Sequence, residues 1–128
     1  MGMGSEFLGG IVYQNYIAPT CDGTIHVEDA GHPVMEGVSS SWTAQSDEFY
    51  IYDRSPRANV HVLASVDEDS YSIDTPVKMG DHPVIWTNPG VKARNVYIQM
   101  GHSPLLITDN PDFTKVFENA ILWTLGKK

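Results

Sequence analysis

A histidine stands directly after an apolar, strand-like segment near the end of the chain. Residues 96–101 (VYIQMG) lead into His102, which is followed by Ser103 and Pro104. In open α/β sheets, ligands bind in the crevice outside the carboxyl ends of the strands. His102 and Ser103 are therefore candidate ligand-binding residues, and a neutral imidazole there could act as a general base or hydrogen-bond a ligand hydroxyl. The alternative is structural: the imidazole fixes the turn before Pro104.

A second candidate is an acidic residue at the start of an aromatic segment. Asp47 and Glu48 precede the sequence FYIY at residues 49–52. Successive residues of a strand point to opposite faces, so these two carboxylates do not form a catalytic acid–base pair. Glu48 could hydrogen-bond a ligand, although a role in capping neighbouring backbone is favoured.

The sequence indicates neither a nucleophile nor a metal site. It contains no Gly-x-Ser-x-Gly or Gly-x-Cys-x-Gly elbow. Cys21 has no basic neighbour to lower its pKa, which favours an ordinary thiol. His26 and Glu28 share one face of a predicted strand, but no third ligand has suitable spacing among the five histidines. We therefore expect no catalytic residue, no bound metal and no cofactor, and an enzymatic role is disfavoured.

Composition narrows the class of protein. The chain has 128 residues, 41% of them hydrophobic, and a net charge of −8. One domain of this size can bury a working core. The acidic balance argues against nucleic acid and anionic membrane surfaces as partners, and no apolar run is long enough to cross a bilayer. A single cysteine and the lack of signal-peptide features favour the cytoplasm. Residues 1–6 could derive from cloning, so the domain is assigned to residues 1–128 with that reservation.

The predicted elements are several strands and one long helix. Asn110 as N-cap and Pro111 as first residue predict a helix that ends near Gly126. Its predicted core-facing stripe is Phe113, Val116, Phe117, Ala120 and Ile121. Strands are expected at residues 11–16, 23–28, 48–53, 59–66, 82–87 and 96–102, with turns at 30–33, 39–41, 54–56 and 67–75. One helix cannot cover both faces of a mostly parallel sheet, so the other face requires either short helices that the sequence does not reveal or a second subunit, and a second subunit is favoured.

Three segments in order resemble the ThuA-like (trehalose-utilisation) family. Residues 32–38 (HPVMEGV) are similar to its HPI-x-x-GL turn, and residues 47–50 (DEFY) with 62–64 (VLA) to two of its strands. Residues 83–86 (PVIW) and 94–102 (RNVYIQMGH) are similar to its last two strands. The resemblance implies an α/β fold, specifically a flavodoxin-like or class I glutamine amidotransferase-like partial domain. We expect a mixed β-sheet with a carboxyl-terminal amphipathic helix.

The chain resembles only the carboxyl-terminal half of these proteins. In the related amidotransferases, a histidine stands at the position of His102, but the missing half supplies the nucleophile. Residues 92–95 (KARN) also replace the family's usual Gly-Lys-Gly-Arg turn. The resemblance implies a half-domain without catalysis that forms a homodimer and binds a small polar, carbohydrate-like ligand. Two alternatives are a sugar-acting enzyme whose site, with His102 as acid or base, is completed across a subunit interface, and a subunit that completes its sheet with a separate protein.

Overall fold

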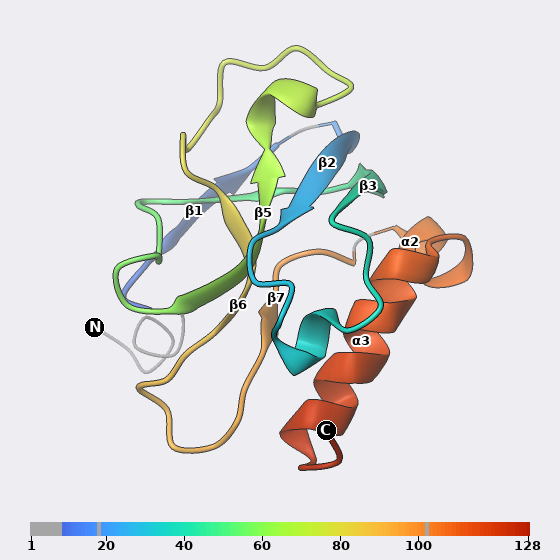
Figure 1. Ribbon diagram of the computed structural model, residues 1–128. Helices are drawn as coiled ribbons and strands as arrows, with labels where there is room; N and C mark the ends of the chain where they lie inside the picture. The colour runs from blue at the N-terminus through green and yellow to red at the C-terminus, as the bar shows by residue number, and fades with distance from the viewer. Residues whose placement is uncertain (1–8, 18, 102) are drawn as a thin grey trace.

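A computed structural model describes residues 9–17, 19–101 and 103–128. Figure 1 shows a curved sheet with the carboxyl-terminal helix packed along one side. The strands are β1 (Tyr13–Tyr16), β2 (Cys21–Val27), β3 (Ser41–Asp47), β4 (Tyr50–Tyr52), β5 (His61–Asp67), β6 (Pro83–Thr87) and β7 (Tyr97–Ile98). The helices are α2 (Pro104–Thr108) and α3 (Pro111–Thr124), with 3₁₀ turns η1 (Pro33–Met35) and η2 (Glu68–Ser70).

The strands form two sheets. The larger has five strands in the order β3-β2-β5-β6-β7, and the smaller pairs β1 with β4. The α/β fold class with a carboxyl-terminal helix is confirmed. Within the described residues, however, every ladder is antiparallel, where we had expected a mixed sheet. Neighbouring strands therefore end at opposite edges, and the rule that places ligands beyond the carboxyl ends of parallel strands does not apply directly.

One face of β2 and its neighbours is polar. The cross-strand partners Thr24 and Thr43, and His26 and Ser41, lie on this face and are exposed or half-buried. An antiparallel sheet can leave such a face in water, because only its other face must be buried. This part of the sheet therefore needs no covering layer, contrary to the reasoning that called for a second subunit there.

The core lies between the other face of the sheet and the helical layer. Val34 of η1, Leu106 of α2 and Val116 of α3 are fully buried in it, together with Ile25 and Val84 of the sheet. A smaller apolar cluster of Ile11, Tyr52 and Trp86 joins the β1–β4 ribbon to the sheet. Both faces near β6 are therefore covered by this one chain.

The long helix begins where the sequence predicts. Asn110 accepts a hydrogen bond from the Phe113 amide as N-cap, and Pro111 is the first residue. Gly126, at φ +75°, follows the helix as expected of a C′ glycine. The predicted core stripe was wrong for two residues: Phe117 is 53% exposed and Ile121 is 46% exposed. The buried face is rotated away from them because η1 packs on the opposite side of the helix.

Strand β3 was missed in the sequence. Trp42 and Ala44 are buried, while Ser41 and Thr43 are exposed, which is the alternation of a half-buried strand. Within the described residues, no helix has the length and apolar character needed to cross a membrane.

Candidate functional site

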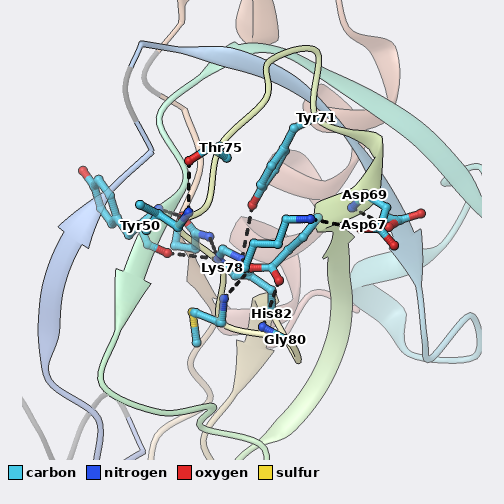
Figure 2. Close-up of polar contacts among 12 residues, drawn as sticks. Tyr50, Asp67, Asp69, Tyr71, Thr75, Lys78, Gly80 and His82 are labelled. Carbon is cyan, nitrogen blue, oxygen red and sulfur yellow. Dashed lines mark hydrogen bonds and ion pairs between the residues drawn. The ribbon is translucent and has the colours of Figure 1, made fainter.

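A buried pair of titratable side chains lies beneath the loop that follows η2. His82 Nδ1 is 2.9 Å from a carboxylate oxygen of Glu68, and the two side chains are 0% and 5% exposed. The same carboxylate accepts hydrogen bonds from the backbone amides of Met79 (2.7 Å) and Gly80 (2.8 Å). Figure 2 shows Tyr71 pointing toward His82 from above and Gly80 beside it. These contacts of the buried Glu68 carboxylate join the two ends of the loop formed by residues 68–82.

The other ring nitrogen of His82 also faces an acceptor. Nε2 lies 2.9 Å from the carbonyl oxygen of Tyr50, on β4. Since carboxylate and carbonyl oxygens only accept, a ring that carries both protons satisfies both contacts. Two more polar atoms lie near the ring: Tyr71 Oη is 3.3 Å from Nδ1 and Gln99 Nε2 is 3.4 Å from Nε2. Because the Gln99 amide nitrogen only donates, it forms no hydrogen bond with a protonated Nε2.

The surroundings of this cluster favour the charged form of Glu68. Burial by itself raises the pKa of the Glu68 carboxyl, but hydrogen bonds from His82, Met79 and Gly80 outweigh it and hold the pKa below its usual value. The pKa of Tyr71 is raised, mainly by burial and then by the Glu68 charge. Both side chains are almost fully buried and hydrogen-bonded to neighbouring backbone, which is typical of a group that fixes structure. Neither Glu68 nor His82 was proposed as a site residue from the sequence.

The three candidate ligand-binding residues have different outcomes. His102 lies outside the described residues. Ser103 is buried, and its hydroxyl oxygen accepts a hydrogen bond from the Leu105 amide at 3.2 Å as the N-cap of α2. Glu48 is half-buried at the turn between β3 and β4. Their proposed contacts with a ligand stay predictions.

The segments that contain Glu48 and Ser103 are joined by hydrogen bonds. The carboxylate of Asp47, which is fully buried, accepts from the Glu48 amide at 2.8 Å and from the Gly101 amide at 3.2 Å. Gln99 accepts from the Tyr50 amide at 3.1 Å. The turn after β3 and the segment before α2 are therefore neighbours, although they are about fifty residues apart in sequence.

Tyrosines gather beside Glu48 on the β1–β4 ribbon. Tyr13 is nearly half exposed, and its ring meets that of Tyr50 edge to face with centroids 5.4 Å apart. The pKa of Tyr13 is raised, first by burial and then by the Glu48 charge, and the pKa of Tyr50 is raised for the same two reasons. This places an acidic side chain against partly exposed aromatic rings, a combination able to stack on and hydrogen-bond a polar ring.

His26 and Glu28, the pair that the sequence analysis considered and set aside as metal ligands, each contact another partner. The Glu28 carboxylate is held by both terminal nitrogens of Arg57 at 2.7 and 2.9 Å. His26 lies instead 3.9 Å from Asp67. Across the part of the chain that the structure describes, no group of three or more His, Cys, Asp or Glu side chains could hold a metal ion.

Comparison with known proteins places the chain in a family. A family model described as trehalose utilisation, ThuA, matches residues 3–124. No curated protein matches. The crystal structure of a ThuA-like protein from Bacteroides uniformis ATCC 8492 is 29% identical, with a TM-score of 0.81 over 97% of this chain and 51% of that chain. One from Parabacteroides merdae ATCC 43184 shares the fold at 18% identity, with a TM-score of 0.57 over 91% of this chain and 42% of that chain.

The chain thus spans about half the length of the solved proteins that it resembles. The family match extends over nearly all of it, including the segments 32–38, 83–86 and 94–102 that carried the resemblance. The chain therefore belongs to the ThuA, or trehalose-utilisation, family.

Proposed function

We propose that this ThuA-family domain is a binding module without catalysis, which self-associates and takes up a small polar, carbohydrate-like ligand. The observation that carries self-association is an apolar surface on the outer side of the two helices. Ile107, Phe117 and Ile121 are all more than 40% exposed there. Phe117 and Ile107 also line a groove of about 360 Å³ that reaches Met100 and Gly101. Apolar surface gathered in one patch is typical of an interaction site.

A second copy of this chain fits the patch. Phe117 and Ile121 are four residues apart, so they lie on one side of α3. If two α3 helices cross antiparallel about a two-fold axis, Phe117 of each copy packs on Ile121 of the other, as an isologous contact requires. In the solved relatives the matching region is about half of the chain.

Measuring the mass in solution tests self-association. The intact chain should sediment as a dimer, and Phe117→Lys should shift it to monomer, because a charge would then be buried at the contact. Leu122→Lys is the matched control, since Leu122 is 40% exposed on the same helix and lies roughly 120° away from the Phe117–Ile121 side. A monomeric wild-type chain, or equal effects of the two variants, would reject the homodimer.

The ligand is proposed to lie at the junction of the β3–β4 turn and the segment before α2. The half-buried Glu48 beside Tyr13 and Tyr50 supports it, because an acidic acceptor and exposed aromatic rings are what a sugar ring needs. Ser103 and His102 are proposed as further ligand contacts. A cytoplasmic location is part of the proposal, because the single cysteine suits a reducing compartment.

Titration with trehalose, glucose and methyl glucoside tests the ligand. We expect saturable binding that is weakened by Glu48→Gln and Tyr13→Ala but not by Glu118→Gln, an exposed glutamate on α3. Equal binding by all variants would reject this site. Turnover of a glycoside that is lost in His102→Ala would instead favour the alternative, a sugar-acting enzyme with a site completed across the interface.

A further inference from the structure

A second cleft lies at the other end of α3, where the β6–β7 loop meets the end of the helix. It has a volume of about 390 Å³, and its lining includes His32, His61, Lys92, Arg94 and Trp123. Figure 1 shows that loop and the carboxyl end of α3 at the same end of the molecule. We propose that this cleft binds the phosphate group of a small phosphorylated metabolite. The site does not depend on the ligand or the dimer proposed above.

The charge of the lining differs from that of the whole chain. The protein has a net charge of −8, yet none of the residues lining this cleft is an aspartate or glutamate. Lys92 and Arg94 are two of only eight lysines and arginines in the chain. Two cations and no acidic side chain in the lining favour anions there even on an acidic protein, since the local potential follows the nearest charges; the nearby Asp29 carboxylate is paired with His61.

Arg94 is held in place with donors to spare. Its Nη1 donates to the carbonyl oxygen of Trp123 (2.9 Å) and to a main-chain oxygen of Lys128, the last residue (3.1 Å), and the guanidinium lies 5.1 Å from the centre of the Trp123 ring. No other hydrogen bond of this guanidinium is formed with the described residues. The Nε and Nη2 edge is therefore available, and this edge is the fork that binds two oxygens of one anion.

His32 supplies a neutral donor. Its Nδ1 accepts a hydrogen bond from the Val34 amide at 3.1 Å, which places the proton of the neutral ring on Nε2. Burial lowers the pKa of His32, against the opposing effect of Asp29, so the ring is neutral at pH 7. Its ring centre lies 4.8 Å from that of Trp123 and 6.1 Å from that of His61, so all three line one space.

Lys92, from the same loop as Arg94, and His61, at the start of β5, complete the lining of the cleft. Lys92 is exposed and makes no ion pair or hydrogen bond with any described residue. His61 binds Asp29 through Nε2 at 2.7 Å, so this carboxylate is already occupied. Donors thus come from His32, the N-cap of η1, and from Lys92 and Arg94 of the β6–β7 loop. A tetrahedral phosphate accepts from several directions at once, whereas a planar carboxylate needs only the Arg94 fork, so phosphate is the better match.

Titration of the intact chain with inorganic phosphate, at constant ionic strength set with chloride, tests the proposal. We expect saturable binding that Lys92→Gln weakens about tenfold, because one charge-assisted hydrogen bond is lost. Lys115→Gln removes the same charge from an exposed position on α3 and should change the affinity less than about twofold. Arg94→Lys should also weaken binding, because it loses the fork.

Glucose 6-phosphate and glucose separate the sources of affinity. The phosphate ester should bind at least as tightly as inorganic phosphate and should show the same loss in Lys92→Gln, whereas glucose should not compete with it. Three results would overturn the proposal: no saturable phosphate binding, equal losses in Lys92→Gln and Lys115→Gln, or competition by glucose alone.

Discussion

Removal of His82 should cost more stability than removal of any exposed histidine. His82→Ala leaves the Glu68 carboxylate buried without its counter-charge and leaves the Tyr50 carbonyl without its 2.9 Å contact. Breaking a buried ion pair by deleting one partner costs about 3–5 kcal/mol. Domains of this size are stable by about 5–15 kcal/mol, so the loss would be a large share of the total.

Urea unfolding followed by circular dichroism measures this loss. With a urea dependence of about 2 kcal/mol per molar, the midpoint should fall by about 2 M. His26→Ala is the matched control, because His26 is exposed on the polar face of the sheet. Its contact with Asp67 is long, at 3.9 Å, and in solvent, so its loss should cost less than about 0.5 kcal/mol. Equal midpoints for the two variants would refute the reasoning.

Glu68→Gln separates charge from shape in the same cluster. The Met79 and Gly80 amides donate to different oxygens of the carboxylate, so the glutamine amide keeps an acceptor for only one of them and also loses the charge facing His82. A loss of about 1–3 kcal/mol is expected. The folded pKa of Glu68 lies below its unfolded value, so its stabilisation is present above about pH 4.3 and is lost as the pH falls through the folded pKa. The acid loss of stability should therefore be shallower in Glu68→Gln, and an unchanged acid limb would contradict the pKa direction.

Two further predictions concern the helix start and the free thiol. Asn110→Ala should cost about 2–3 kcal/mol in the same urea assay, because it removes the N-cap of α3 and the two 2.7 Å contacts of its side-chain amide with Thr43 and Gln45. Asn119→Ala is the comparison, because it also removes a buried side-chain amide with two hydrogen bonds, to the carbonyl oxygens of Val34 and Glu36, but no helix cap. Burial, followed by the nearby acids, raises the pKa of Cys21 to about 11, so a disulfide reagent at pH 8 should modify the native chain far more slowly than the unfolded chain.

Local signals in the sequence predicted local structure well. The start of α3 depends on Asn110 and Pro111, which act within one turn, and the structure has both in those roles. The buried side of the helix was less predictable, because the apolar stripe is wider than the core contact. Periodicity cannot tell which part of such a stripe meets η1 and which part, including Phe117 and Ile121, stays exposed.

Strand β3 shows a different limit. Its outward positions are serine and threonine, and its inward positions include the small Ala44, so the segment reads as a turn-rich stretch. The antiparallel arrangement explains why that composition is stable: one face needs only to contact water. Parallel strands are buried on both faces and have nearly continuous apolar sequences. A search for such sequences overlooks a half-polar strand like β3.

The buried cluster was beyond sequence reasoning for a clear physical reason. Residues 67–70 (DEDS) have the composition of an exposed loop, and three of the four are exposed or half-buried. Glu68 is the exception because His82, fourteen positions away, supplies a charge, and the amides of Met79 and Gly80 supply donors. The chain from Tyr71 to His82 forms no helix or strand, so its backbone groups lack a regular ladder. The Glu68 carboxylate accepts hydrogen bonds from two of those backbone amides, as the carbonyl oxygens of a neighbouring strand would in a sheet.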